Sequence, residues 1–213
     1  MKYDLSHIRR EYTQRSLPIS DVDKDPIRQL ESWIDEAVHA EASEPTAMIL
    51  STANQEGKVT SRTVLLKKLK SEGLIFFTNY NSLKGKQLKE NPQAAALFYW
   101  AELERQVRVE GKTDKISAEE SDSYFESRPE ASRIGAWASD QSTEIPDREY
   151  LEQKQHEYAE YFRNKKISRP QNWGGYIIKP VRFEFWQGRE NRLHDRIEYS
   201  LESHKWVIRR LAP

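Results

Sequence analysis

The sequence contains no cysteine. This absence excludes disulfides, thiolate metal sites and thiol nucleophiles within the chain, and it gives no sign of secretion. Long apolar runs are missing too: the longest, Ala94 to Ala101, is far shorter than the roughly 20 residues of a membrane-spanning helix. The opening residues, MKYDLSHIRREY, lack the apolar stretch of a signal peptide. We therefore expect a soluble cytoplasmic protein that does not bind a membrane.

Net charge is absent as well, because 34 basic residues balance 34 acidic ones. A protein dedicated to nucleic acids normally carries excess positive charge, so this balance argues against a nucleic-acid partner. Local basic clusters can still bind a small anion. The six tryptophans and the 11% aromatic content argue against disorder. They predict an aromatic-rich core that extends in part across a subunit interface.

Glycine is scarce, and the eight glycines form neither G-x-G-x-x-G nor a Walker loop. Neither a Rossmann dinucleotide site nor a P-loop is therefore supported. The chain also lacks a G-x-S-x-G elbow, and its five histidines lack the H-E-x-x-H spacing. These absences disfavour a hydrolase of the elbow type and a metal enzyme, so we expect no metal in the site.

Hydrophobic periodicity predicts one domain over 25–213, preceded by a mobile N-terminal arm over 1–24. Asp25-Pro26 suits the start of a helix that runs to about Glu41. Short strands joined by tight turns follow as far as residue 116, including one over 59–69, and such short connections indicate antiparallel pairing. After a helical segment over 117–164, strands return. We expect an α+β fold whose antiparallel sheet is closed or nearly closed.

Cations in two early segments suit an anionic ligand. Arg62 and Lys67 bound a β-favouring run, although a separation of five places them on opposite faces of a regular strand. An edge strand with solvated cations is the simpler interpretation. Ser82 and Lys84 lie at the start of a predicted short helix, where free N–H groups suit a phosphate. A plain capped helix explains this segment equally well.

Two later segments add to this pattern. Tyr124, Arg128 and Ser132 recur at spacings of four, a set that suits a phosphate monoester if the bend at Pro129 preserves their convergence. An exposed polar helix face is the alternative.

A strand predicted over Arg192 to Leu201 would place Arg192, His194 and Arg196 on one face, over about 13 Å. Together with Trp186 they would line a site for a flat, anionic ligand. Charged strand faces are common, but two arginines that flank a histidine are costly to align without an anion.

Together these segments resemble the pyridoxine (pyridoxamine) 5′-phosphate oxidase family. The resemblance covers nearly the whole chain, in order. The matching stretches are REYT at 10–13, PTAM at 45–48, RTVLLK at 62–67, FFTN at 76–79, LERQV at 103–107, YFESRPEASRIGAWAS at 124–139, QS at 141–142, WGG at 173–175, EFWQG at 184–188, NRLHDR at 191–196 and RLAP at 210–213.

The resemblance implies a split β-barrel of six to eight antiparallel strands with peripheral helices. It implies a homodimer that binds FMN at the subunit interface. The expected reaction converts pyridoxamine 5′-phosphate or pyridoxine 5′-phosphate to pyridoxal 5′-phosphate, in the biosynthesis or salvage of this vitamin B6 cofactor. O2 would accept the electrons and leave as H2O2, and the amine substrate would also release ammonia.

Site residues are carried over motif by motif. The resemblance assigns to FMN binding Arg62, Thr63, Val64, Leu65, Leu66, Lys67, Phe77, Thr78, Lys84, Gln106, Gln141, Ser142, Trp186 and Arg196. It assigns to substrate binding Arg9, Arg10, Glu11, Tyr12, Lys67, Tyr124, Arg128, Ser132, Arg192, Leu193 and His194. Arg192 and His194 would serve catalysis by holding the pyridine ring near the flavin.

The chain departs from the family pattern at two positions. Leu83 stands where many members have arginine beside the phosphate-binding lysine, which weakens the expected grip on FMN unless Lys86 compensates. Phe77 replaces a frequent tyrosine. Two other functions remain open, a flavin reductase on the same barrel and a non-catalytic protein that stores or delivers pyridoxal phosphate.

Overall fold

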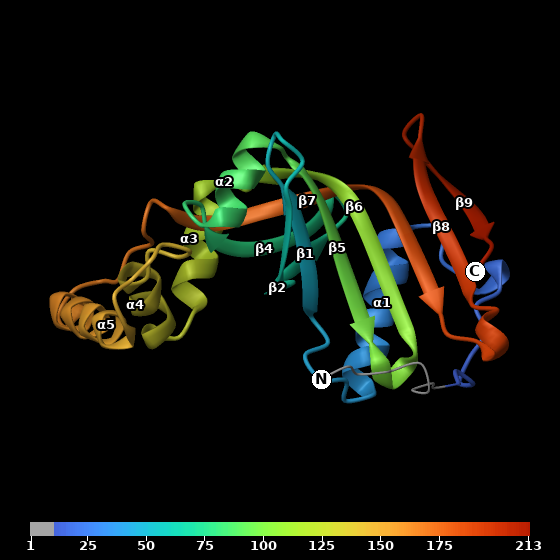
Figure 1. Cartoon of the computed structure of the whole chain (residues 1–213), viewed down its shortest axis with the longest axis horizontal. Helices are drawn as coiled ribbons and strands as arrows, with labels where there is room; N and C mark the ends of the chain where they lie inside the picture. The colour runs from blue at the N-terminus through green and yellow to red at the C-terminus, as the bar shows by residue number, and fades with distance from the viewer. Residues whose placement is uncertain (1–10) are drawn as a thin grey trace, which may run out of the picture. The chain divides into compact units, whose positions relative to one another are not determined.

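The structure, a computed structural model, describes residues 11–213 (Figure 1). Arg9 and Arg10 of the predicted arm lie outside the described residues. The chain divides into two compact units. The terminal unit consists of the segment up to Met48, Ala96–Glu110 and Val181–Pro213, and the central unit consists of Ile49–Ala95 and Gly111–Pro180.

Five α-helices and nine strands make up the described part of the chain, with three short 3₁₀ turns. The helices are α1 (Pro26–His39), α2 (Leu83–Glu90), α3 (Ala118–Ser127), α4 (Glu130–Ala138) and α5 (Arg148–Phe162). The strands are β1 (Ala47–Ala53), β2 (Val59–Leu65), β3 (Lys68–Lys70), β4 (Gly73–Asn79), β5 (Gln93–Trp100), β6 (Arg105–Lys115), β7 (Trp173–Gln187), β8 (Asp195–Glu202) and β9 (Lys205–Leu211).

The strands form one sheet in the order β2-β1-β5-β6-β7-β4-β3, with β8 beside β7 and β9 beside β8. β7 pairs antiparallel with both β4 and β8, and β9 continues the sheet as the second strand of a hairpin (Figure 1). The predicted α+β class with an antiparallel sheet and peripheral helices is confirmed. The run predicted as one strand over 59–69 is divided between β2 and β3, which gives a ninth strand.

The core of the terminal unit lies between α1 and one face of β7 and β8. Asp25 caps α1 by accepting a hydrogen bond from the Ile27 N–H at 2.9 Å, as its sequence predicts. The Trp33 ring meets Phe185 edge-to-face at 5.1 Å, and Tyr199 is fully buried beside them. Because side chains alternate across a strand, the opposite face of these strands carries the polar residues.

An aromatic cluster forms the core of the helical part of the central unit. It contains Phe125, Ile134, Phe162, Ile167 and Trp173. α4 and α5 pack side by side over it (Figure 1). The capped helix at Ser82 is confirmed, since Ser82 accepts a hydrogen bond from the Gly85 N–H at 3.3 Å. Ser117 caps α3 in the same way and accepts from the Glu120 N–H at 3.1 Å.

The prediction of a strand that begins at Arg192 is wrong. Asn191 and Arg192 have left-handed backbones, with φ of 55° and 62°, within a 3₁₀ turn over Glu190–Arg192. Two successive left-handed residues are incompatible with an extended strand, and asparagine tolerates this conformation better than most residues. β8 therefore begins only at Asp195. No helix of the described residues is long and apolar enough to cross a membrane.

We predict that Gly175→Ala destabilises the protein by about 1–3 kcal/mol because its site is already filled. A Cβ at Gly175 would lie 2.4 Å from the Ile116 side chain and 3.0 Å from the Phe77 ring. Urea unfolding measures the change. Gly135→Ala is the matched control, because a Cβ there meets nothing within 4 Å and alanine favours a helix. Equal stability of the two variants would contradict this account.

Candidate functional site

A cavity of about 820 Å³ lies within the central unit. Its wall combines strand β2, the end of β4, the start of α2 and one side of α3 and α4. It is lined by Thr60, Ser61, Arg62, Thr63, Val64, Leu65, Lys67, Phe77, Thr78, Asn79, Leu83, Lys84, Tyr124, Arg128, Ser132, Gly135, Ala136, Ser139, Gln141, Ser142 and Trp173.

Lys84 is a buried cation in this wall, with 7% of its surface exposed. Its Nζ donates to Gln141 Oε1 at 2.9 Å, to Thr78 Oγ1 at 3.1 Å and to Ser82 Oγ at 3.3 Å. All three acceptors are neutral. Burial, and then the positive charge of Arg62, lower the pKa of Lys84 to about 8. A charged lysine at this position therefore lacks its usual compensation by a carboxylate.

Arg62 is the second cation in the same part of the cavity. Its Nη1 donates to Leu50 O at 3.1 Å and to Thr52 Oγ1 at 2.7 Å, and Nη2 donates to Thr60 Oγ1. Burial lowers the pKa of Arg62. Across the described residues, neither Arg62 nor Lys84 forms an ion pair with an acid. Two neighbouring cations held only by neutral groups form a site that a phosphate would complete.

A second cationic group comes from α3 and α4. α3 ends at Ser127 and α4 begins after Pro129, so the predicted bend is present. Tyr124, Arg128 and Ser132 nevertheless line the same cavity, which confirms their convergence. Arg128 Nη1 is buried and has no hydrogen-bond partner among residues 11–213. Burial also lowers the pKa of Arg128.

Arg128 is held by aromatic rings instead of acids. Its guanidinium carbon lies 4.7 Å from the centre of the Trp173 ring, within cation–π range. The Phe77 ring stacks on Tyr124 with ring centres 3.8 Å apart and on Trp173 at 5.5 Å, so the three rings are nearly parallel. The rings fix the direction of Arg128 while its Nη1 remains available to an anion. An orphaned buried N–H of this kind indicates a missing acceptor.

Most residues predicted for the FMN phosphate and the substrate phosphate meet in this cavity. Lys67 lines it and is exposed, and its Nζ forms no hydrogen bond or ion pair within the described range. Leu66 differs from its neighbours: its side chain is buried in the core and does not line the cavity. Gln141 and Ser142 reach the cavity from the segment after α4.

Sequence reasoning found only Ser132 on one face of α4. Gly135, Ala136 and Ser139 also line the cavity and were missed, although they follow Ser132 at the spacing i+3, i+4 and i+7 of a single helix face. Their spacing was the available signal, but small residues carry no charge to draw attention. Thr60, Ser61 and Asn79 were missed as well and lie beside predicted residues.

The terminal unit holds a separate group of predicted residues. Tyr12, Trp186 and His194 form an aromatic cluster, with ring centres 4.7–5.7 Å apart. His194 Nδ1 accepts a hydrogen bond from the Arg189 N–H at 3.1 Å. Burial, and then the charge of Arg192, lower the pKa of His194. His194 is therefore neutral at pH 7, with its proton on Nε2.

The other predicted residues of this unit are less clustered. Arg196 lies directly opposite Trp186 across the β7–β8 pair. Arg192 precedes the strand, so the single strand face predicted for Arg192, His194 and Arg196 does not form. Leu193 is 69% exposed, and Glu11 is exposed too. Gln106 is half-buried on β6.

The segment after Glu11 is bound to the terminal unit by its backbone. The N–H groups of Thr13 and Gln14 donate to Glu104 Oε2 at 2.9 and 3.2 Å. The Leu17 N–H donates to Asp195 Oδ2 at 3.0 Å. These contacts hold Tyr12 beside Trp186 and His194.

The antiparallel sheet and its peripheral helices define a protein of the split-β-barrel class. Residues 34–162 match the family "Pyridoxamine 5'-phosphate oxidase", and residues 173–213 match "Pyridoxine 5'-phosphate oxidase C-terminal dimerisation region". The chain belongs to the pyridoxamine 5′-phosphate oxidase family.

Individual relatives agree with this assignment. The chain is 49% identical to a pyridoxine/pyridoxamine 5'-phosphate oxidase of Cyanothece sp. (strain PCC 7425 / ATCC 29141), with both chains covered in full. It is 52% identical to the pyridoxine/pyridoxamine 5'-phosphate oxidase 1 of Ralstonia nicotianae, over 98% of this chain and 99% of that one.

Solved structures support the fold. PhzG from Burkholderia lata 383, in complex with tetrahydrophenazine-1-carboxylic acid, superposes with a TM-score of 0.89 at 31% identity, over 94% of this chain and 99% of that chain. A pyridoxamine 5'-phosphate oxidase-related, FMN binding protein from Nostoc punctiforme PCC 73102 has a TM-score of 0.66 at 18% identity, over 88% of this chain and 95% of that one.

We predict that Lys84→Met raises the melting temperature of the ligand-free protein by about 5 °C at pH 7. The pKa of Lys84 lies near 8 when folded, below its value in an unfolded chain, so its charge destabilises the fold fully below pH 8. The cost fades as pH rises towards 10.4, the ordinary lysine value. The gain should therefore shrink at pH 10, as measured by circular dichroism melting.

Lys86→Met is the control for this experiment, because Lys86 is exposed on the same helix. It should leave the melting temperature unchanged at both pH values. A lower melting temperature for Lys84→Met at pH 7 would show that the buried charge is not a burden on the ligand-free fold.

Proposed function

We propose that this chain is an FMN-dependent oxidase that converts pyridoxamine 5′-phosphate or pyridoxine 5′-phosphate to pyridoxal 5′-phosphate in the cytoplasm. O2 is the electron acceptor and is reduced to H2O2, and with the amine substrate water hydrolyses the oxidised product to the aldehyde and ammonia. The observation that carries the proposal is the presence of two cationic groups in one cavity, neither of which pairs with an acid in the part of the chain that the structure describes. The names of the relatives, which are half identical to this chain over their whole length, support the same reaction.

The first cationic group suits the phosphate of FMN. Arg62 and Lys84 supply charge, and Thr78 supplies a hydroxyl already bonded to Lys84 at 3.1 Å. The bound phosphate would relieve the repulsion between the two cations and remove the cost of burying Lys84. Leu83 lines the cavity in an exposed position and adds no charge to this grip. Lys86 does not line the cavity, so it does not replace the missing cation there.

The second group suits the phosphate of the substrate. Arg128 offers its orphaned Nη1, Tyr124 and Ser132 offer hydroxyls, and Lys67 offers a free ammonium group. Charge-assisted hydrogen bonds of this kind are short and directional. They would hold the substrate by the end that does not react, so that its C4′ carbon is presented to the flavin.

Bound FMN would supply the redox chemistry, as the acceptor of a hydride equivalent from the substrate C4′ carbon. The residues of the chain supply position and charge. Arg192 and His194 would hold the pyridine ring in a reactive orientation, an effect that can contribute several kcal/mol. His194 is neutral and its Nδ1 already accepts a hydrogen bond, so a positioning role suits it better than proton abstraction.

We propose that the enzyme is a homodimer with FMN between the two copies. The match of residues 173–213 to the family's dimerisation region supports this arrangement. In the dimer, the predicted residues of the terminal unit would complete the cavity. These are Gln106, Trp186, Arg192, Leu193, His194 and Arg196, with Glu11 and Tyr12 from the N-terminal segment.

The proposal is tested by purifying the protein, recording its visible spectrum and following aldehyde and peroxide with both substrates under air. A yellow protein that forms both products supports it. A protein that stays colourless after soaking in FMN would sink it. Faster bleaching of the flavin by NADH than by pyridoxamine 5′-phosphate would indicate a reductase. Binding of pyridoxal phosphate without peroxide formation would indicate a storage protein.

Arg128→Gln is expected to raise the KM for pyridoxamine 5′-phosphate by about 10- to 100-fold, because one charged contact to the substrate phosphate is lost. FMN content should not change, since Arg62 and Lys84 are intact. Arg133→Gln is the matched control: Arg133 lies on α4 and does not line the cavity. Steady-state kinetics decide, and equal KM values for both variants would contradict the assignment.

Arg192→Ala is expected to lower kcat by about 100-fold while the flavin content stays close to that of the unaltered protein. The loss arises because the pyridine ring is no longer confined near the flavin. Absorbance at the flavin maximum gives the FMN content, and aldehyde formation per bound flavin gives kcat. Loss of FMN with normal turnover of each remaining flavin would contradict this role.

A further inference from the structure

Among the predicted ligand-binding arginines that the structure describes, Arg196 alone is paired with a carboxylate. Its Nε donates to Glu184 Oε1 at 3.1 Å and its Nη2 donates to Glu184 Oε2 at 2.9 Å, which makes a two-point fork. Its Nη1 donates to the backbone oxygen of Ala212 at 2.8 Å. A guanidinium has five N–H groups, so two remain for a ligand.

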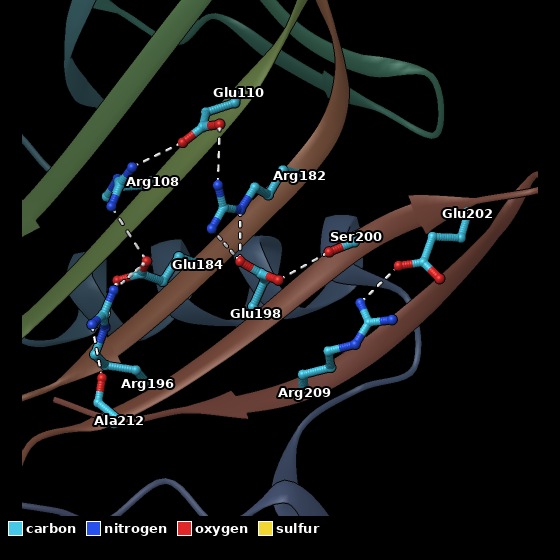
Figure 2. Close-up of polar contacts among 10 residues, drawn as sticks. All are labelled: Arg108, Glu110, Arg182, Glu184, Arg196, Glu198, Ser200, Glu202, Arg209 and Ala212. Carbon is cyan, nitrogen blue, oxygen red and sulfur yellow. Dashed lines mark hydrogen bonds and ion pairs between the residues drawn. The ribbon is translucent and has the colours of Figure 1, made fainter.

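Glu184 is the centre of this arrangement. Only 4% of its surface is exposed, and its Oε2 also accepts from Arg108 Nη1 at 3.3 Å. Figure 2 shows the carboxylate between Arg108 and Arg196, on the polar face of β6, β7 and β8. A buried carboxylate with two arginines is fully compensated, and its fork leaves Arg196 little rotational freedom.

The same face contains a second buried glutamate in an equivalent setting. Glu198 lies directly opposite Glu184 in the β7–β8 register and is 8% exposed. It accepts from Arg182 Nε at 2.6 Å and from Ser200 at 3.0 Å (Figure 2). Arg182 has no assigned ligand role. The two glutamates are therefore alike in burial and in having an arginine partner, but Glu184 holds Arg196 and Arg108, whereas Glu198 holds Arg182 and Ser200.

We propose that Glu184 is a positioning residue: it holds the Arg196 guanidinium beside Trp186 so that the two free N–H groups meet the flavin already oriented. The inference rests on the proposed function, which assigns Arg196 and Trp186 to FMN. Trp186 and Arg196 are direct partners across the two strands, so fixing Arg196 also fixes its distance from the Trp186 side chain. An arginine ordered before binding loses less freedom when the ligand arrives.

The test is Glu184→Gln, which keeps the size of the side chain. A glutamine has one acceptor oxygen and places an NH2 group against an arginine N–H, so the fork is lost. We expect this variant to bind FMN about tenfold more weakly than the unaltered holoprotein. The affinity is measured from the rise of flavin fluorescence when the holoprotein is diluted. Glu198→Gln is the control. Its melting temperature should fall about as much as that of Glu184→Gln, but its FMN affinity should stay within about twofold of the unaltered protein.

Arg196→Gln and the double variant with Glu184→Gln separate the possible failures. Arg196→Gln should weaken FMN binding, and adding Glu184→Gln should weaken it no further, because Glu184 acts through Arg196. If Arg196→Gln binds FMN normally, the assignment of Arg196 within the proposed function is wrong. If it weakens FMN while Glu184→Gln does not, the positioning role alone is wrong.

Two other outcomes overturn the inference. One is an equal loss of FMN from Glu184→Gln and Glu198→Gln, which would show that the whole ion-pair network matters and not the Arg196 fork. The other outcome concerns Glu184→Asp, which is used in place of Glu184→Gln if the glutamine variant does not fold. Its shorter carboxylate cannot keep both bonds of the fork, so FMN affinity equal to that of the unaltered protein would overturn the proposal.

Discussion

The central cavity depends on one unfavourable arrangement, two cations held close together and out of water. Lys84 and Arg62 repel each other, and burial lowers the pKa of both. The fold tolerates these two charges because neutral groups accept their hydrogen bonds. Thr52 accepts from Arg62, and Thr78 and Gln141 accept from Lys84. A carboxylate in the same position would stabilise the empty cavity and would compete with any anionic ligand.

Three arginines of the terminal unit show the opposite arrangement. Arg105 is buried, and its Nη1 donates to Glu36 Oε2 at 2.9 Å. Arg182 and Arg196 are paired with Glu198 and Glu184 in the same manner. Pairing with an acid fixes these arginines on the sheet, and it still leaves Arg196 two N–H groups for a ligand. Arg62 and Arg128 have no acid partner among the described residues, so a ligand can supply their counter-charge.

Local chemistry made much of the fold predictable. Asp25, Ser82 and Ser117 cap helices where their sequence context places them, because a cap depends on only a few neighbouring residues. The site was found through motifs, since no periodicity brings Lys84 and Arg128 together across 44 positions of chain. The prediction of a strand that begins at Arg192 was wrong because the alternation of residue types along a sequence does not reveal a left-handed turn. The Glu184 fork depends on cross-strand register, which tertiary pairing sets.

The unpaired cations also connect ligand binding to folding. A ligand that binds only the folded state stabilises it by mass action, and here it would also remove the repulsion between Arg62 and Lys84. The bound anion favours the charged form of Lys84, so its pKa would rise from about 8 when a phosphate enters. The helical part of the same unit would gain in the same way, since Arg128 Nη1 would find an acceptor. The cavity is therefore the part of the fold whose stability changes most between the empty and the occupied protein.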